Sequence, residues 1–197
     1  MNLALFASGG GSNAAAILDA IAGGRLPARA VLLVADRPGI GAIEKAEAAG
    51  VPVAVVRLAD YADEDAFAAA LLDVLRAHGA DFVALAGYLK RIPPAVVAAF
   101  DGRMVNVHPS LLPAFGGPGL YGRRVHEAVL ASGATESGCT VHLVDEDYDT
   151  GAVLAQVRVP VMPGDTPDTL AARILAEEHK LYPEVLARLA EDSSTRP

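Results

Sequence analysis

The chain has little of what marks an extracellular, membrane-spanning or nucleic-acid-binding protein. Cys139 is the single cysteine among 197 residues, which excludes an internal disulfide framework and suits a reducing compartment such as the cytoplasm. Hydrophobic residues make up 52% of the chain. No apolar run, however, approaches the ~18 residues that a membrane span needs. The first residues include no basic segment, so we expect neither a signal peptide nor a membrane partner.

Basic residues are also scarce. The 16 lysines and arginines stand against 24 aspartates and glutamates, which leaves a net charge of −8. A protein that grips a nucleic-acid backbone normally carries a basic face, so we expect no nucleic-acid partner. A small anionic ligand stays compatible with this charge, because backbone N–H groups can hold it.

Segments of strand length alternate with helical segments along most of the chain. The expected strands cover residues 3–7, 30–35, 53–56, 82–86 and 104–107, and the expected helices 13–22, 41–49, 64–78 and 167–189. This alternation predicts an α/β fold, a mostly parallel Rossmann-like twisted sheet with helices on both faces. Residues 138–144 and 152–159 flank an acidic turn and predict an antiparallel C-terminal strand addition. We predict one domain over residues 1–190 and a frayed tail over 191–197.

A glycine-rich loop, Ser8-Gly9-Gly10-Gly11-Ser12-Asn13, follows the first expected strand. In open α/β sheets ligands bind beyond the carboxyl ends of the strands, and a helix N-terminus offers free N–H groups to an anion. One interpretation is a phosphate-monoester site. A dinucleotide site is equally open, because Gly9-x-Gly11-x-x-Ala14 fits the G-x-G-x-x-G/A spacing and Asp36 ends the second strand. An ordinary glycine turn without a ligand is the third interpretation.

Two polar residues, Asn106 and His108, close the fifth expected strand. Residues two apart on a strand face the same side, so the amide and the imidazole should project together. Such a pair can donate hydrogen bonds to an oxyanion that develops during group transfer. For the dipeptide alone, a loop-capping role is the alternative.

An acidic turn at residues 145–149 is by default a solvated hairpin loop. Its last residue, Asp149, stands just before a return into a strand, and a carboxylate beside His108 would favour the imidazolium ion. Asp149-Thr150-Gly151 also matches the aspartic-protease triplet, but that chemistry needs two carboxylates that share a proton. The sequence holds no second triplet of this kind.

These motifs together resemble the formyltransferases that use 10-formyltetrahydrofolate, over nearly the whole chain. The resemblance rests on Ser8-Gly9-x-Gly11-Ser12-Asn13, Leu85-Ala86-Gly87-Tyr88, Asn106-x-His108-Pro109-Ser110-Leu111-Leu112-Pro113, Gly138-Cys139-Thr140-Val141-His142, Asp149-x-Gly151 and Glu178-His179-x-Leu181-Tyr182-Pro183. The first and the last of these segments point to the members that act on glycinamide ribonucleotide.

The resemblance implies a reaction and a role for each matching residue. The chain would move the formyl group of 10-formyltetrahydrofolate, as co-substrate, to the amine of glycinamide ribonucleotide in purine biosynthesis, without a metal. Catalysis would depend on Asn106, His108 and Asp149, and binding of the ribonucleotide on Gly11, Ser12, Asn13 and Glu178. The folate would lie against Leu85, Tyr88, Leu89, Lys90, Arg91, Ile92, Val97 and Asn106. His142 and His179 are interpreted as structural.

The sequence departs from the family pattern in two places. Acids at residues 63–65 stand where the resemblance implies an arginine near the folate tail, and the glycine-rich loop at 116–124 is longer than expected. Two rival functions stay open. A formyl-tetrahydrofolate hydrolase would release formate without an amine acceptor, and a dinucleotide-dependent oxidoreductase would use the glycine loop and Asp36.

Overall fold

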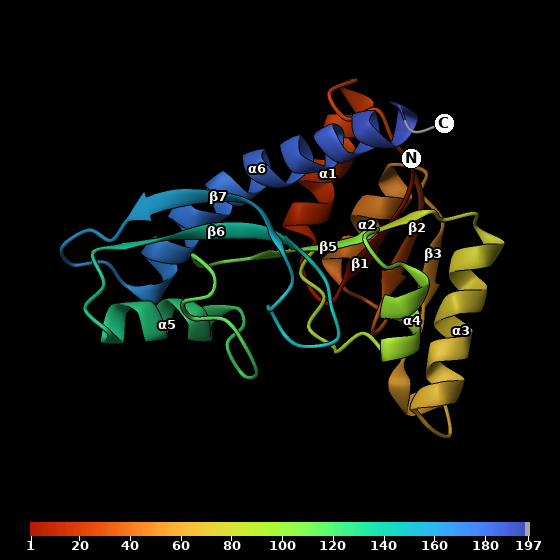
Figure 1. Cartoon of the computed structure of the whole chain (residues 1–197), viewed down its shortest axis with the longest axis horizontal. Coiled ribbons are helices and arrows are strands. Elements are labelled where there is room, and N and C mark those ends of the chain that lie inside the picture. The colour runs from red at the N-terminus through yellow and green to blue at the C-terminus, as the bar shows by residue number, and fades with distance from the viewer. Residues whose placement is uncertain (196–197) are drawn as a thin grey trace.

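The structure is a computed structural model that describes residues 1–195, with side chains as far as Asp192. Seven strands form one sheet in the order β3-β2-β1-β4-β5-β6-β7 (Figure 1). The strands are β1 Asn2–Ala7, β2 Arg29–Ala35, β3 Val53–Val55, β4 Phe82–Leu85, β5 Met104–His108, β6 Glu136–Leu143 and β7 Val153–Pro160. The helices are α1 Ser12–Ala22, α2 Gly41–Ala48, α3 Glu64–Ala77, α4 Pro94–Ala99, α5 Arg123–Ala131 and α6 Pro167–Thr195, with a 3-10 turn at Leu58–Asp60.

The pairing of the strands confirms the predicted fold class. Strands β1 to β5 pair in parallel, and β6 and β7 add to β5 in antiparallel fashion. Parallel strands need helical crossovers, which cover both faces of the sheet and leave its central strands apolar throughout. Strand β1 fits this rule, because all its residues from Leu3 to Ala7 are fully buried.

Alternating side chains of the strands pack into two cores. Leu3 and Leu5 belong to the core under α1, α2 and α6, whereas Ala4 and Phe6 belong to the core under α3 and α4. The same alternation in β5 sends Val105 and Val107 into the first core. Residues 106 and 108 therefore project on the opposite face, at the end of the strand.

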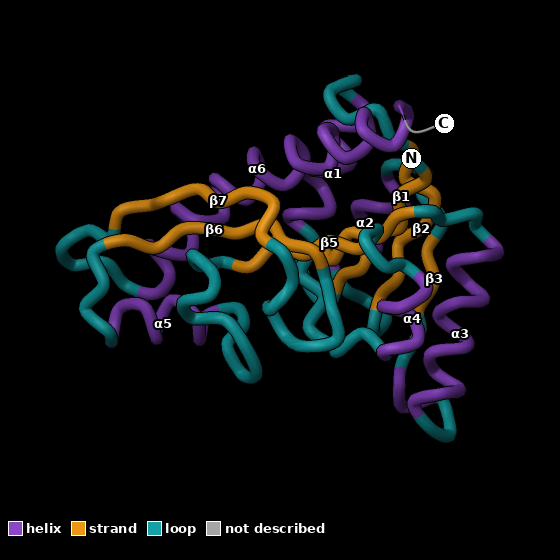
Figure 2. The backbone as a smooth tube through the Cα atoms, viewed as in Figure 1, coloured by secondary structure: helices purple, strands orange, loops and turns teal. Residues whose placement is uncertain are grey.

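The strand order places a crevice at the carboxyl edge of the sheet. Strands β2 and β3 lie on one side of β1, and β4 and β5 on the other, so the direction of winding reverses between β1 and β4. The connections that follow β1 and β4 run to opposite faces from such a point, which opens a ligand-binding crevice between them. Figure 2 shows loops gathered beside β5, between the parallel strands and the β6–β7 ribbon.

Tyr182 of α6 ties the helix layer to this edge. Its side chain is fully buried, and its hydroxyl lies 3.2 Å from the carbonyl oxygen of Leu85 and 3.0 Å from that of Val105. Because the two carbonyls belong to β4 and β5, this hydroxyl ties α6 to both strands.

The helices differ from the sequence prediction in three places. Helices α4 and α5 were not predicted: the first is a short proline-started turn, and the second follows a glycine-rich loop that obscures its start. Helix α6 continues to Thr195, past the boundary predicted at residue 190, because the chain has no glycine or proline between those positions. Residues 196–197 of the predicted tail lie outside the described residues. Within the described part of the chain, no helix combines the length and apolarity of a membrane span.

Gly138 of β6 stands where a side chain cannot fit. A Cβ added there would lie 1.9 Å from the carbonyl oxygen of Val157 and 2.8 Å from Cδ2 of Leu111. We expect Gly138→Ala to lower the free energy of unfolding by about 2 kcal/mol or more, because β6 must move against its neighbour. Urea denaturation measures this loss. Gly10→Ala, whose added Cβ meets nothing within 4 Å, is the matched control. Equal destabilisation by the two substitutions would contradict the steric argument.

Candidate active site

A cavity of about 560 Å³ opens at the carboxyl edge of the sheet, and it receives most of the predicted site residues. Of those predicted to hold the folate, the lining includes Leu85, Tyr88, Leu89, Lys90, Arg91, Ile92 and Asn106. Val97 is the exception, because it is buried in the core under α3 and α4 rather than exposed to the cavity. Residues 144–149 form a facing wall, and Arg91 Nη2 donates to the Glu146 carbonyl at 3.2 Å.

Asn106 and His142 meet across two paired strands. They are register partners in the β5–β6 ladder, and Asn106 Nδ2 lies 3.1 Å from His142 Nε2. The other ring nitrogen, Nδ1, lies 2.8 Å from the Leu143 carbonyl and must donate to it. In a neutral His142 ring, Nε2 therefore accepts one N–H of the Asn106 amide. The second N–H of that amide is left for a ligand in the cavity.

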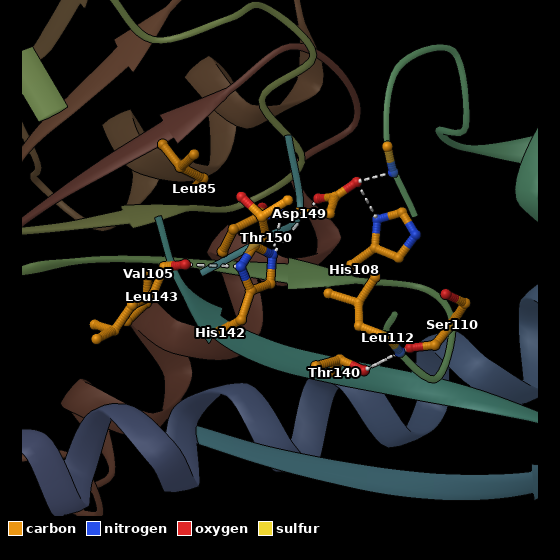
Figure 3. A network of polar contacts seen from close by, with 12 residues as sticks. Leu85, Val105, His108, Ser110, Leu112, Thr140, His142, Leu143, Asp149 and Thr150 are labelled. Carbon is orange, nitrogen blue, oxygen red and sulfur yellow. Dashed lines mark hydrogen bonds and ion pairs between the residues drawn. The ribbon is translucent and has the colours of Figure 1, made fainter. Parts of the chain in front are cut away.

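Asp149 lies between two histidines (Figure 3). Its Oδ2 lies 3.5 Å from His108 Nδ1 and accepts a hydrogen bond from the Gly117 N–H at 2.9 Å, while Oδ1 lies 3.6 Å from His142 Nε2. Burial acts to raise the pKa of Asp149, but His142, His108 and the Gly117 N–H lower it, and the net pKa lies below its ordinary value. The structure thus brings the three predicted catalytic residues together around an ionised carboxylate.

Both ring nitrogens of His108 face oxygen atoms. Nε2 lies 2.9 Å from the carbonyl oxygen of Phe115, and Nδ1 faces Asp149. Burial lowers the pKa of His108 and is the largest influence; Asp149 and the Phe115 carbonyl raise it, and the net pKa stays below its ordinary value. Asp149 therefore opposes the desolvation without cancelling it. This corrects the expectation that Asp149 keeps His108 protonated in the resting protein.

The loop before α1 joins the cavity through Asn13. Gly11 has a φ of 71°, and a Cβ there would lie 2.5 Å from Cα of Ala42, so only glycine fits. Asn13 Nδ2 donates to Glu178 Oε2 at 2.7 Å, which links α1 to α6. Burial raises the pKa of Glu178, and the Asn13 amide offsets part of that rise. Asn13 and Glu178 line the cavity, whereas Gly11 and Ser12 lie beside it.

Sequence reasoning missed Ser8, which connects two walls of the site. The Ser8 side chain is fully buried, its hydroxyl accepts the Leu89 N–H at 2.9 Å, and its own N–H donates to the Gly87 carbonyl at 3.1 Å. The loop after β1 and the loop after β4 are thereby held together. The sequence does show a serine directly after a strand. Its partner, the loop after β4, could be identified only once the order of the strands in the sheet was known.

The role of His142 was also misread, because it is more than a structural residue of β6. Its ring contacts Asn106 and faces Asp149, so it takes part in the polar network of the site. The sequence signal was the segment Gly138-Cys139-Thr140-Val141-His142, in which Thr140 and His142 lie two residues apart and so face the same side of a strand. That threonine accepts the Leu112 N–H at 3.0 Å and donates to the Ser110 carbonyl at 2.6 Å, which anchors the loop after His108.

The described residues contain no group of three or more His, Cys, Asp or Glu placed to hold a metal ion. An amide, an imidazole and a carboxylate at a switch point of a parallel sheet are instead the parts that stabilise an oxyanion. Fold and site together thus define an α/β enzyme of the group-transfer class.

The chain belongs to the formyl transferase family, whose sequence model matches residues 1–186. It is 40% identical over 186 residues to a phosphoribosylglycinamide formyltransferase of Bacillus subtilis, covering 94% of this chain and 93% of that protein. It is 51% identical over 191 residues to a chloroplastic phosphoribosylglycinamide formyltransferase of Arabidopsis thaliana, covering 96% of this chain. The chain spans 65% of the length of that plant protein, which is less than two thirds.

A solved structure agrees with this relationship. The glycinamide ribonucleotide transformylase 1 of Symbiobacterium toebii superimposes with a TM-score of 0.92 at 41% identity, over 98% of this chain and 88% of that one. The similarity therefore extends over the whole sheet and over the loops that build the site.

Proposed function

We propose that the chain transfers the formyl group of 10-formyltetrahydrofolate to the amine of N1-(5-phospho-D-ribosyl)glycinamide, giving the N-formyl product and tetrahydrofolate. One observation carries the proposal: the Asn106–His108–Asp149 cluster and the Asn13–Glu178 pair line the same cavity. The family supports formyl transfer, and the names of the relatives support the acceptor.

The folate fits the wall built by the loop after β4. A flat, partly aromatic ligand needs apolar surface on its faces and hydrogen-bonding groups at its edge. Leu85 and Ile92 supply apolar surface, and the backbone of residues 145–148 supplies polar groups opposite. The folate brings the formyl group, and the wall orients it toward the strand end that carries Asn106.

The polar cluster would stabilise the charge that develops when the amine attacks the formyl carbon. Asn106 keeps one N–H free for the oxyanion. The Nε2–H of His108 now donates to the Phe115 carbonyl, and the oxyanion would replace that oxygen as its acceptor. A negative charge beside the ring raises the pKa of His108, so the developing oxyanion favours the protonated ring that donates to it. The attacking amine loses one proton and the departing folate nitrogen gains one, so the transfer balances.

Glu178 would bind the amine before it reacts. Asn13 occupies its Oε2, and the buried carboxyl group lines the cavity, so Oε1 can accept a hydrogen bond from the glycinamide amine. Burial raises the pKa of Glu178, so its negative charge, which would stabilise an ammonium, is itself less favoured in this site. The neutral amine is the nucleophile that the reaction needs.

Ser12→Ala should mainly raise the KM for the ribonucleotide, whereas Asn13→Ala should also lower kcat, because Asn13 donates to the Glu178 carboxyl group that binds the amine. The phosphate lies far from the reacting carbon, so its contacts contribute nearly equal binding to ground state and transition state. We expect roughly a tenfold rise or more for loss of one hydrogen bond to a charged group, with the KM for the folate unchanged. Steady-state kinetics with each substrate varied in turn measure both constants. A change confined to the folate KM would contradict the assignment.

The proposed function is tested by following tetrahydrofolate formation with and without the ribonucleotide. We expect product only when the amine acceptor is present. Formate release without an acceptor would identify a hydrolase instead, an alternative that leaves the Asn13–Glu178 pair without a role. Saturable binding of a nicotinamide dinucleotide, with no effect of folate, would favour the oxidoreductase.

We also propose that the protein acts in purine biosynthesis in the cytoplasm, with the two small molecules as its binding partners. The buried, unpaired Cys139 supports a reducing compartment. The compartment differs among relatives, since the Arabidopsis protein is chloroplastic.

A further inference from the structure

The loop before α1 turns successive carbonyl oxygens toward one neighbouring segment. Residues 37–45, which form the turn after β2 and the start of α2, bind all of them, and α1 and α2 pack side by side (Figure 1). The bonds run from Arg37 Nη2 to the Ser8 oxygen at 2.5 Å, from the Ala42 N–H to the Gly9 oxygen at 3.1 Å, and from Lys45 Nζ to the Gly10 oxygen at 2.6 Å.

These bonds also set the direction of the N–H groups. In a trans peptide the C=O and the following N–H point in opposite directions. With the carbonyls of Ser8 to Gly10 held on the side of α2, the N–H groups of Gly9 to Gly11 face away from it. In the described chain, none of these N–H groups donates to another protein atom. They form a row of free donors that leads into the N-terminus of α1.

The orientation of these N–H groups depends on the bonds from residues 37–45, because glycine by itself restricts the orientation of its neighbouring peptides only weakly. Gly9 and Gly10 carry no side chain, so their own φ and ψ angles restrict the orientation of the neighbouring peptides less than those of any other residue would. A rotated peptide would present its carbonyl oxygen to an anion and repel it. Helix α2 supplies one of the bonds from its backbone, and the side chains of Arg37 and Lys45 supply the others.

We propose that Lys45 and Arg37 are positioning residues for the phosphate group of the substrate. Lys45 holds the Gly10–Gly11 peptide so that the Gly11 N–H faces the phosphate, and Arg37 does the same for the Gly9 N–H through the Ser8 carbonyl. The ligand class is a phosphate monoester. This inference rests on the proposed function and deepens it, by naming residues outside the cavity that determine affinity for the ribonucleotide.

The proposal predicts effects that are specific to single peptides. In the parent protein, titration with inorganic phosphate should shift the ¹⁵N–¹H resonances of Gly9 and Gly11. Lys45→Met should weaken phosphate binding about tenfold, as expected for a hydrogen bond to a charged group, and should reduce mainly the Gly11 shift. Arg37→Met should reduce mainly the Gly9 shift. Lys45→Arg keeps a positively charged donor at the Gly10 carbonyl, so this variant should bind phosphate as the parent protein does.

The controls separate positioning from charge and from folding. Arg76→Met removes one positive charge from the exposed end of α3 and should leave phosphate binding unchanged. The Lys45 bond is exposed, so Lys45→Met should unfold near the parent temperature. In turnover, Lys45→Met should raise the KM for the ribonucleotide and leave kcat and the folate KM unchanged.

Three outcomes would overturn the proposal: unchanged phosphate affinity in Lys45→Met, equal loss of both glycine shifts in either variant, or an equal weakening by Arg76→Met. Equal loss would mean that the cations attract phosphate from a distance without orienting a peptide. Phosphate titration requires no turnover, so its result is independent of the acceptor assay. Peptide-specific loss together with no use of the ribonucleotide would refute the proposed function and leave the positioning role intact.

Discussion

Asn106→Ala and His108→Ala are each expected to lower kcat by roughly 100-fold or more, as loss of an oxyanion donor does in other enzymes. One N–H of the Asn106 amide binds His142, and the other is left for the oxyanion. The His108 Nε2–H lies against the Phe115 carbonyl oxygen and can donate to the oxyanion in its place. Both side chains line the cavity at the end of β5, so truncation should leave the strand pairing intact.

Single-turnover kinetics with both substrates at saturation measure the loss, and circular dichroism verifies the fold. His78→Ala is a matched control: that ring bonds the Val74 carbonyl at the end of α3, away from the cavity, and its loss should not change turnover. The double variant should be little slower than either single one, because residues that stabilise the same charge act as a unit. Near-normal turnover in both single variants would remove Asn106 and His108 from catalysis.

Asp149→Asn should shift the pH dependence of kcat toward acid. Burial already holds the pKa of His108 below its ordinary value, and Asp149 is the largest influence that raises it. Asparagine keeps the shape of the side chain and deletes the charge, so the pKa of His108 should fall further. If protonated His108 stabilises the transition state, activity is lost as pH rises through that pKa. The descending limb of the profile should therefore move to lower pH, with residual turnover best on the acid side.

Glu146→Gln and Asp147→Asn are the controls, since both carboxylates are exposed and solvent screens their charges. Titration of His108 by NMR in the three variants distinguishes an electrostatic role of Asp149 from a role in shaping its turn. The shaping role is a real alternative, because Asp149 has a φ of 59° and accepts the Gly117 N–H. An unchanged His108 pKa in Asp149→Asn would contradict the electrostatic role of Asp149.

The sequence by itself determined the strands of the sheet and helices α1, α2, α3 and α6, but not α4, α5 or the end of α6. Alternating apolar strands and helices dictate a mostly parallel sheet, because only crossovers of that length can join parallel neighbours. The placement of Asn106 and His108 at a strand end followed from the two-residue period of β-structure alone. The glycine at position 11 follows in part from local geometry, since its φ is positive. These properties depend on contacts between near neighbours in the chain.

Only the tertiary structure decided which distant residues meet. Register in the β5–β6 ladder places His142 beside Asn106, and the packing of α6 on α1 brings Glu178 to Asn13. Burial decided the sign of the His108 pKa shift, which the sequence argument had assigned to Asp149 alone. Desolvation, strand register and long-range hydrogen bonds depend on the final positions of segments far apart in the chain. No local pattern specifies them, because each is set by the packing of the whole fold.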